Sequence, residues 1–290
     1  MMKITSNVVW LSDKTNGREI VGTKALNLIE MVKLNLPVPN GFVIPYSFFN
    51  QFLEENKVEK EVYDLLSKIN SKNIQKTEEK IKKLILSGKF SYDASACIET
   101  SFKKLKKNYN SVSARSSANC EDSVEASFAG QFESFLFIDN IKKLLNSIKE
   151  CWASSYKSST VMYSIMQGIE PKDIKMAVII QGMVDSDKAG VMFTKNVWNS
   201  DENILIEATL GIGENVVGGL KNPDRYIVDR PKLKVMDKKI IGEEILSAKD
   251  IRQLTKYGLI LEKHFKRPQD VEWCIKNNNI FLLQTRPITG

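Results

Sequence analysis

Two short runs near the C-terminus alternate between apolar and polar residues, which predicts a pair of β-strands. They read QDVEWCIK over residues 269–276 and IFLLQTRP over residues 280–287. A strand places successive side chains on opposite faces, so each run gathers its polar groups on one face. The residues that share these two faces are Asp270, Glu272 and Cys274 in the first run, and Ile280, Leu282, Gln284 and Arg286 in the second.

The asparagines between the two runs predict a hairpin loop over residues 277–279, with an asparagine in the left-handed region. This loop places Glu272 opposite Gln284, and Asp270 opposite Arg286. One carboxylate and one amide oxygen suit Mg²⁺ when phosphates complete its coordination shell, and an arginine suits a phosphoryl oxygen. The plainer alternative is a surface salt bridge between Asp270 and Arg286.

Length and composition predict a globular protein of two lobes. A chain of 290 residues with 42% hydrophobic content can bury one large core or two lobes with a cleft between them. It has no run of about eighteen apolar residues and starts without an apolar signal core, so we expect a cytoplasmic protein with no membrane partner. No two cysteines form a C-x-x-C pair, which predicts reduced thiols. They are Cys97, Cys120, Cys151 and Cys274.

The formal net charge of +7 is diffuse. Between residues 54 and 108, thirteen lysines and no arginine stand among nine acidic residues. Lysines interleaved with acids along helices are typical of solvated faces, so we expect no nucleic-acid partner.

A lysine precedes the first predicted helix. Apolar residues recur at spacings of three and four from Ala25 to Leu36, and Pro37 ends the pattern. Lys24 therefore lies near a helix N-terminus, where free N–H groups and the dipole favour an anion. The alternative is an ordinary surface lysine.

Three further segments have helical spacing. Residues 47–108 predict a lysine-rich helical subdomain, residues 141–167 one long helix, and residues 247–264 a helix in the second lobe. The only histidine, His264, lies at the C-terminal end of the last helix, where the dipole suits a structural role.

A continuous apolar strand is predicted over residues 176–184, and antiparallel strands follow it in the second lobe. The first strand contains Gln181. A buried amide is costly unless it is hydrogen-bonded, so Gln181 is expected either to bond to the backbone or to meet a ligand.

Residues 113–135 form a polar stretch in which Arg115 is the only cation. The stretch fits neither a core strand nor an amphipathic helix, so we interpret it as a loop between strands over 109–114 and 132–138. Hydroxyls and one guanidinium suit a phosphate, while the alternative is a plain surface loop.

Several segments resemble, in the same order, the ATP-binding domain of the phosphoenolpyruvate synthase, pyruvate phosphate dikinase and rifampin phosphotransferase family. RSSANCED and ASFAGQFESF are similar to the family's RSSA-x-x-ED and ASFAGQ segments, and VGTKALNLIEM to its G-G-K-G-x-N-L-x-E-M segment. The other matching segments are QGMV, GIGENVVGG with NPDRYIV, and QDVEW with LLQTRP.

The resemblance implies an α+β ATP-grasp fold, with ATP clamped between two lobes. It implies an N-terminal lobe over residues 1–168, with a helical subdomain of about residues 47–108 inserted in it, and a C-terminal lobe over residues 169–290. In the family, backbone groups of the strand that matches QGMV contact adenine.

The resemblance also implies the site. The residues expected to bind ATP are Lys24, Arg115, Gly130, Ser134, Gln181, Met183, Glu272, Gln284 and Arg286. Among them, Arg115 and Arg286 are expected to be catalytic, and Glu272 and Gln284 to hold Mg²⁺. ATP and Mg²⁺ are therefore the expected cofactors.

The implied reaction is phosphoryl transfer from Mg-ATP to a histidine on a separate mobile domain, as in pyruvate, water dikinase. The expected partners are that phosphohistidine domain and an acceptor-binding domain, carried on another chain or in a missing C-terminal part. One alternative is the ATP component of an enzyme like rifampin phosphotransferase. The other is a nucleotide-binding module without catalysis, suggested by Thr23 and Ala25, which replace two of the family's glycines.

Overall fold

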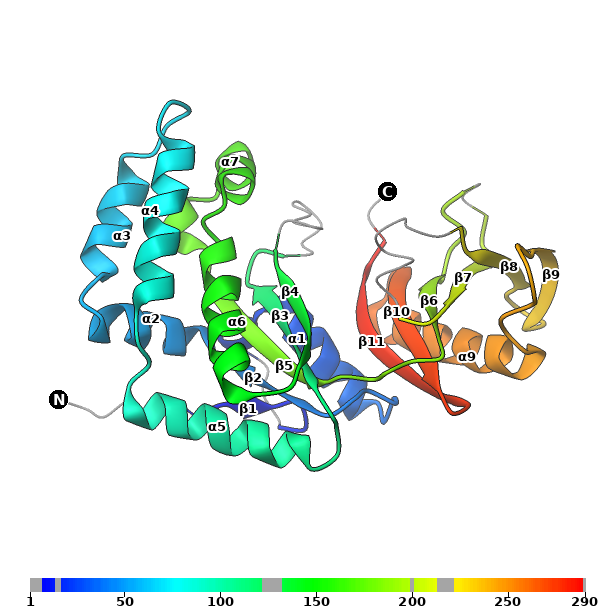
Figure 1. The fold of residues 1–290 in the computed structure, drawn as a ribbon. Coiled ribbons are helices and arrows are strands. Elements are labelled where there is room, and N and C mark those ends of the chain that lie inside the picture. Colours follow the sequence, from blue (N-terminus) through cyan, green and yellow to red (C-terminus); the bar gives the residue numbers. More distant parts are fainter. Residues whose placement is uncertain (1–6, 14–16, 122–131, 199–200, 213–221, 289–290) are drawn as a thin grey trace. The chain divides into compact units, whose positions relative to one another are not determined.

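The computed structural model describes residues 7–13, 17–121, 132–198, 201–212 and 222–288, and the chain divides into two compact units (Figure 1). Unit 1 comprises Met1–Ile29 and Asn40–Met183, and unit 2 comprises Glu30–Pro39 and Val184–Gly290. Each unit contains an antiparallel sheet with helices, which confirms the mixed α and β class predicted from the sequence. Residues 169–183, assigned to the second lobe from the sequence, lie in unit 1, because their strand is hydrogen-bonded inside its sheet.

The sheet of unit 1 has the strand order β1-β2-β5-β3-β4, and every neighbouring pair is antiparallel. Its strands are β1 (Val9–Trp10), β2 (Gly41–Ile44), β3 (Val112–Ala118), β4 (Ser134–Ile138) and β5 (Met176–Gly182). All seven residues of β5 are buried, as its unbroken apolar run predicts for an inner strand.

Five of the helices of unit 1, from Tyr46 to Ser154, share one apolar core with this sheet. Trp152 is at its centre, with ring centroids 5.0 Å from Phe49, 5.2 Å from Phe52 and 5.5 Å from Phe90. Helix α6 covers one face of the sheet (Figure 1). The helices are α1 (Arg18–Lys33, of which residues 30–33 belong to unit 2), α2 (Tyr46–Glu55), α3 (Glu59–Ser67), α4 (Ile74–Ser87), α5 (Tyr92–Lys106), α6 (Ile141–Ser154), α7 (Ser158–Met166) and the short 3₁₀ helix η1 (Pro171–Asp173).

The prediction of one long helix over residues 141–167 is wrong. The chain leaves the helical path after α6 and starts again at Ser158. The carboxylate of Glu78 on α4 accepts hydrogen bonds from both the backbone N–H and the hydroxyl of Ser158, at 2.8 and 2.5 Å. A long-range partner therefore caps the new helix N-terminus, which residue spacing alone does not reveal.

The interpretation of residues 113–135 as a loop is wrong as far as residue 118, and residues 122–131 of this segment lie outside the described residues. Residues 112–118 form β3, a strand hydrogen-bonded to β5 on one side and to β4 on the other. Small hydroxyl side chains fit this buried position because they find backbone partners, such as the Ser116 hydroxyl, which donates to the Glu133 carbonyl at 2.9 Å.

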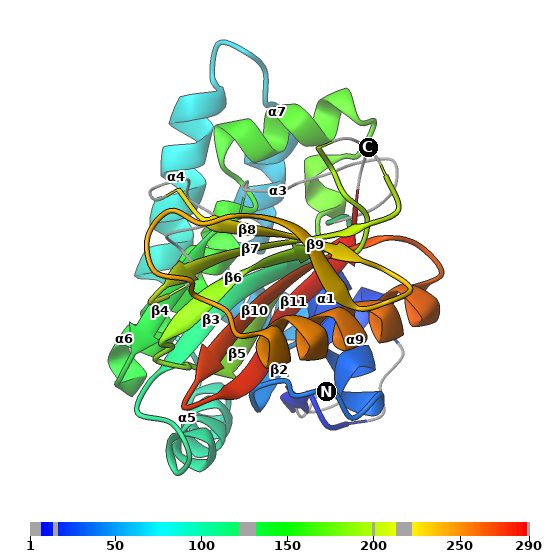
Figure 2. The ribbon, with the colours of Figure 1, turned by 90° about the vertical axis from the view of Figure 1, so that its right-hand side faces the viewer.

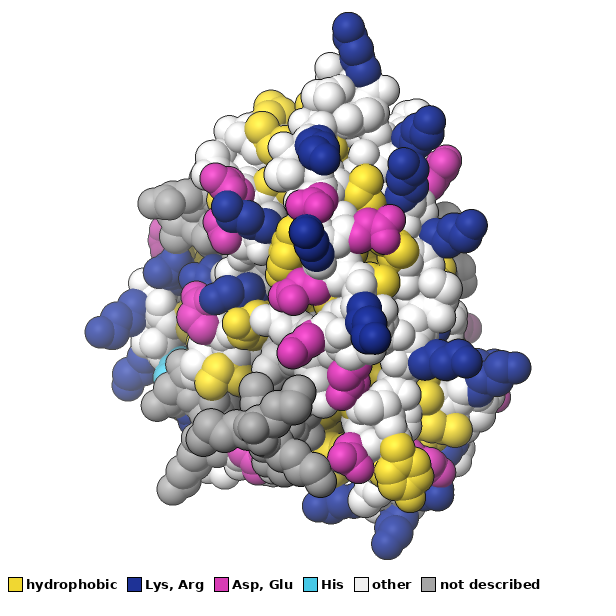
Figure 3. Space-filling view, turned by 90° about the vertical axis from the view of Figure 1, so that its left-hand side faces the viewer, with side chains coloured by type: hydrophobic (Ala, Val, Ile, Leu, Met, Phe, Trp, Pro, Cys, Tyr) yellow, Lys and Arg dark blue, Asp and Glu magenta, His cyan; other side chains and the backbone are white. Residues whose placement is uncertain are grey.

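The lysine-rich helices present mixed charges to solvent. Figure 3 shows lysine and arginine side chains interspersed with aspartate and glutamate over this face of the molecule. Several are paired along or between helices, as Lys103 is with Glu99 at 2.7 Å and Lys82 with Glu150 at 3.1 Å. None of the helices in the described part of the chain is long and apolar enough to cross a membrane.

Unit 2 has a sheet with the strand order β11-β10-β6-β7-β8-β9, also antiparallel throughout (Figure 2). Helix α9 (Ala248–Phe265) packs on β10, β11 and β6 and begins with a capping box formed by Ser247 and Asp250. The strands are β6 (Lys188–Phe193), β7 (Ile204–Leu210), β8 (Asp224–Asp229), β9 (Lys234–Lys239), β10 (Gln269–Lys276) and β11 (Asn279–Pro287).

The β10–β11 hairpin has the predicted register near its open end, but a different loop. Lys276 pairs with Asn279, so the loop contains two residues, Asn277 and Asn278, both with positive φ of 50° and 60°. A bulge after Glu272 shifts the register by one residue, so that Glu272 pairs with Gln284.

The bulge also corrects the predicted faces of β11. Leu282 pairs with Trp273, so it lies on the face opposite to Glu272 and Gln284 rather than with them. Leu282 and Trp273 are both fully buried, which explains why the bulge is favourable: it places an apolar residue in the core while it keeps Gln284 beside Glu272.

A buried carboxylate organises the turn that follows β9. Asp224, at the start of β8, accepts hydrogen bonds from the backbone N–H groups of Ile241 at 2.8 Å and Ile245 at 3.1 Å. The Tyr226 hydroxyl donates to the same carboxylate at 3.3 Å. The aspartate of the NPDRYIV segment is therefore structural.

We predict that Asp224→Ala lowers the free energy of unfolding by roughly 2–4 kcal/mol, because it removes the acceptor shared by two backbone N–H groups and the Tyr226 hydroxyl. Urea unfolding measures the effect. Glu243→Ala, an exposed carboxylate in the same turn, is the control and is expected to change stability by less than about 0.5 kcal/mol. Equal stability of the two variants would contradict the structural role of Asp224.

Candidate functional site

One face of the unit 1 sheet brings together three of the predicted site residues. Arg115 on β3 is directly opposite Ser134 on β4 and Ile179 on β5. Ser113, two residues before Arg115, is opposite Gln181. Directly opposed residues of antiparallel strands share a face, so Arg115, Ser134 and Gln181 lie on the same side of this sheet.

The N-terminal part of α1 is joined to this face by Ser117. The Ser117 hydroxyl donates to the Val21 carbonyl at 2.8 Å and accepts from the Ala25 N–H at 3.0 Å. The helix breaks at Gly22, whose φ is 76° and ψ is 172°, and a Cβ on Gly22 would overlap the Ser117 carbonyl. A strand side chain thus takes the part of a helix cap, as a serine at the N-cap usually does.

The residues that replace the family's glycines fit the helix. Gly22 alone has non-helical angles within α1, and only there is the freedom of glycine required. Ala25 is fully buried, and the Thr23 hydroxyl accepts a hydrogen bond from Nε of Arg18 at 2.9 Å. The side chains of Thr23 and Ala25 therefore cause no backbone strain here.

Lys24 is paired with a buried carboxylate. Its Nζ lies 2.5 Å from Oε1 of Glu121, and the side chains of Lys24 and Glu121 are 16% and 1% exposed. No local pattern connects these two residues, because almost a hundred positions separate them in the chain. The pairing excludes an ordinary surface lysine at position 24.

The end of β5 is held through its backbone. The N–H of Gly182 donates to the Asn40 carbonyl at 2.8 Å, and the N–H of Met183 donates to the Ser111 carbonyl at 3.0 Å. Gln181 is buried at 2% exposure. The roles of Gln181 and Met183 as nucleotide contacts stay predictions, and Gly130 lies outside the described residues.

In unit 2, the register of the β10–β11 hairpin places the two predicted metal ligands opposite each other. Glu272 pairs directly with Gln284, and Asp270 pairs with Arg286. Nε and one terminal nitrogen of Arg286 each lie 2.9 Å from the same oxygen of Asp270. The salt bridge considered as an alternative is therefore present, and the role of Arg286 in binding phosphate stays a prediction.

Further charged residues lie across this face of the unit 2 sheet, separated from Glu272 by Val191. Glu272 is opposite Val191, which is opposite Glu207, which in turn is opposite Arg225. Nε of Arg225 donates to Glu207 at 2.8 Å, and the guanidinium lies 4.3 Å from the ring centre of the exposed Trp198. Sequence reasoning missed this group, although an acidic and a basic residue in neighbouring strands are a signal for such a pair.

His264 is fixed within unit 2. Its Nε2 lies 3.1 Å from a carboxylate oxygen of Glu30, and its ring contacts Phe265 edge-on, with centroids 4.9 Å apart. These contacts agree with the structural role expected from its place at the end of α9.

The cysteines are free thiols. Burial raises the pKa of Cys120, Cys151 and Cys274 to about 12, so these three carry no thiolate at neutral pH. They offer no nucleophile to a phosphoryl group.

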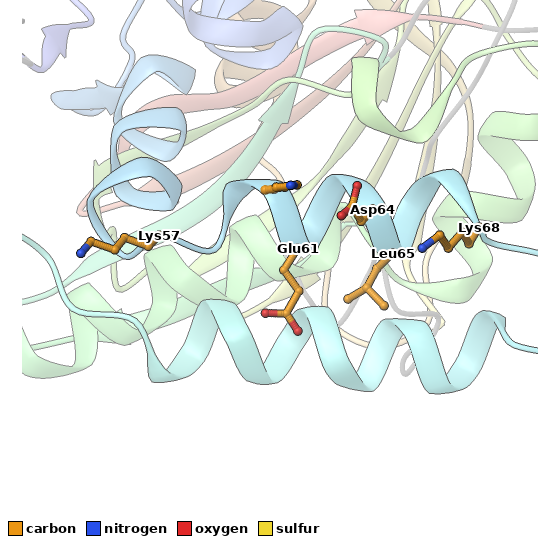
Figure 4. Close-up of a pocket in the computed structure, with 6 residues that line it drawn as sticks. Lys57, Glu61, Asp64, Leu65 and Lys68 are labelled. Atoms are coloured by element: carbon orange, nitrogen blue, oxygen red, sulfur yellow. The ribbon is translucent and has the colours of Figure 1, made fainter.

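Helix α3 lines a shallow surface pocket of about 380 Å³ (Figure 4). Lysines line it together with Glu61, Asp64 and Leu65, and the labelled side chains point in several directions rather than toward one centre. The acids offset the lysines, so the pocket is not a built anion site. Within the described ranges, no group of three acidic, histidine or cysteine side chains forms a metal cluster.

Comparison with known proteins gives the family of this chain. The family model for the pyruvate phosphate dikinase AMP/ATP-binding domain matches residues 18–248 and 241–290. The chain therefore belongs to this family, as the resemblance of its motifs predicted.

Relatives include a probable phosphoenolpyruvate synthase of Archaeoglobus fulgidus, 33% identical over 97% of this chain and 41% of that protein. The phosphoenolpyruvate synthase of Pyrococcus furiosus is 29% identical over 97% of this chain and 44% of its own length. An uncharacterized phosphotransferase of Bacillus subtilis, YvkC, is 32% identical over 93% of this chain and 34% of that protein. The chain thus spans less than half the length of these relatives.

Solved structures resemble the chain only distantly. D-alanyl-alanine synthetase A from Vibrio cholerae aligns with 91% of this chain and 54% of that one, at 10% identity and a TM-score of 0.38. Such a likeness supports no inference about the site.

We predict that Gly22→Ala lowers the free energy of unfolding by about 3 kcal/mol or more, because the new methyl group meets the Ser117 backbone at a positive φ. Thermal or urea unfolding measures the loss. Gly242→Ala is the matched control, since a Cβ there has nothing within 4 Å. If Gly22→Ala were as stable as Gly242→Ala, the close contact between α1 and β3 would be wrong.

Proposed function

We propose that this chain is the Mg-ATP-binding, phosphoryl-donating part of a phosphotransferase like phosphoenolpyruvate synthase. The observation that carries the proposal is the register of the β10–β11 hairpin, which sets Glu272 against Gln284 and Asp270 against Arg286 in a chain of this family. The finer fold assignment, an ATP-grasp with ATP clamped between two lobes, is part of the proposal.

The cations have the clearest roles in it. Lys24 and Arg115 in unit 1, and Arg286 in unit 2, bind the phosphates, because charge-assisted contacts to phosphoryl oxygens are the strong ones. Arg115 and Arg286 also stabilise the charge of the transferred group, which makes them the catalytic residues. Gln181 and Met183 contact the adenine, and Gly130 and Ser134 are further ATP-binding residues in the proposal.

The residues of the hairpin fit Mg²⁺. Glu272 supplies a carboxylate and Gln284 an amide oxygen from directly opposed positions, and hard oxygen ligands are what Mg²⁺ takes. Two protein ligands are typical of Mg²⁺ sites in which the nucleotide phosphates supply further oxygens. Bound there, the ion would offset phosphate charge.

The phosphoryl group passes from ATP to a histidine nitrogen on a separate mobile domain: a P–N bond forms while a P–O bond of the triphosphate breaks, and the remaining nucleotide is the leaving group. The histidine later carries the phosphoryl group to the final acceptor. His264 does not serve as that carrier, because Glu30 and Phe265 hold it at the end of α9. The greater length of the relatives supports the existence of a phosphohistidine domain and an acceptor-binding domain beyond this chain, or on another chain. We place the reaction in the cytoplasm.

Two alternatives differ from this proposal, one in the final acceptor and one in the absence of catalysis. The final acceptor is pyruvate in a phosphoenolpyruvate synthase, and an antibiotic hydroxyl in an enzyme like rifampin phosphotransferase. A module that binds nucleotide without catalysis was suggested by Thr23 and Ala25. Both residues have helical angles, so neither position requires a glycine for its backbone conformation.

We predict that the chain binds ATP in a Mg²⁺-dependent manner and that Arg115→Ala weakens binding by roughly 1.5–3 kcal/mol, the value of a lost charge-assisted contact. Isothermal titration calorimetry measures both. Arg252→Ala, an exposed arginine on α9, serves as the control and should bind as the parent does. A folded Arg115→Ala variant with unchanged affinity would make Arg115 a structural residue.

We predict that this chain, given ATP labelled in its γ or β phosphate, transfers label to an added histidine domain of a relative. The product is an acid-labile phosphohistidine. His264→Ala is expected to transfer equally well. Label that stays on this chain, disappears in His264→Ala and is chased by pyruvate would refute a separate carrier histidine.

A further inference from the structure

The carboxylate paired with Lys24 is placed by the same strand that carries Arg115. Glu121 follows the end of β3 by three residues, and one of its oxygens accepts a long hydrogen bond from the Ala118 N–H at 3.4 Å. Its other oxygen contacts Nζ of Lys24. Lys24 is therefore joined to β3 through its side chain, just as Ala25 is joined through Ser117.

A second contact ties the same turn together. Arg18 donates from Nε to the Thr23 hydroxyl at 2.9 Å, and its terminal nitrogen lies 3.5 Å from the Glu121 carbonyl. The turn that carries Thr23 and Lys24 is thus held on both sides by the segment after β3.

Because Glu121 is buried, its pairing with Lys24 fixes the position of the lysine ammonium. A carboxylate with 1% exposure is costly without a cation, so Glu121 holds the ammonium of Lys24 in place. A lysine ammonium has three N–H donors, and a carboxylate needs only one of them, so the ammonium can contact a phosphate oxygen at the same time. A lysine fixed in advance also loses less side-chain freedom when it binds.

We propose that Glu121 is a positioning residue: it acts through Lys24 and orients the ammonium toward the phosphates of ATP without touching the nucleotide. This inference rests on the proposed function, because it requires Lys24 to bind phosphate. It predicts that the effect of Glu121 on ATP affinity disappears when Lys24 is absent.

A double-mutant cycle tests this coupling. The ATP affinity of the parent, Lys24→Met, Glu121→Gln and the double variant is measured by calorimetry with Mg²⁺. We expect Lys24→Met and Glu121→Gln each to weaken binding about tenfold, and the double variant to bind no more weakly than Lys24→Met alone. Glu99→Gln, which breaks the exposed pair with Lys103, is the control and should bind as the parent does.

Each outcome separates a positioning role from a purely structural one. A structural role would make Glu121→Gln weaken binding by the same factor with or without Lys24, which would overturn the inference, as would unchanged affinity in Glu121→Gln. If Glu121→Gln alone does not fold, the double variant, which removes both charges, is compared with Lys24→Met: equal affinity supports the inference and further loss contradicts it. A folded parent that does not bind Mg-ATP would contradict the proposed function as well.

Discussion

The close contact between Gly22 and Ser117 is the constraint on which the arrangement of unit 1 depends. Helix α1 can break and restart beside β3 only because residue 22 has no side chain, and the Ser117 hydroxyl then joins the restarted helix to the strand. This junction places Lys24 next to the end of the strand that carries Arg115. Lys24 and Arg115 are far apart in the sequence, and the close contact at Gly22 brings Lys24 beside the strand that carries Arg115.

Buried or partly buried carboxylates hold the cations in both units. Glu121 contacts Lys24 in unit 1, and Asp270 contacts Arg286 in unit 2. Such pairs add little net stability once desolvation is counted, because the cost of burying the charges offsets their attraction. In the proposed function their use is geometric: they fix long side chains before a ligand arrives, and preorganised charges are the effective ones in phosphoryl transfer.

Sequence reasoning succeeded where a local pattern determines the structure. The helix predicted over residues 247–264 is α9, and the alternation of β10 placed Glu272 with Asp270. The pairing of Glu272 with Gln284 was also predicted, but with a loop that is one residue too long. The bulge after Glu272 shifts the register by the same one residue, so the pairing is still right. The failures have long-range causes. Glu78 caps the start of α7, β4 pairs with β3 at Arg115, and Glu121 forms an ion pair with Lys24. No pattern in the neighbouring residues predicts these contacts.

In the proposed function, one nucleotide engages the polar faces of both units. Hydrogen–deuterium exchange with and without Mg-ATP tests this proposal, because each backbone amide reports on its own segment. A nucleotide clamped by both units predicts slower exchange in residues 22–26 and 115–118 and also in residues 270–274 and 282–286, with no change in α3. Protection confined to one unit, or absent from both at saturating Mg-ATP, would contradict the proposal.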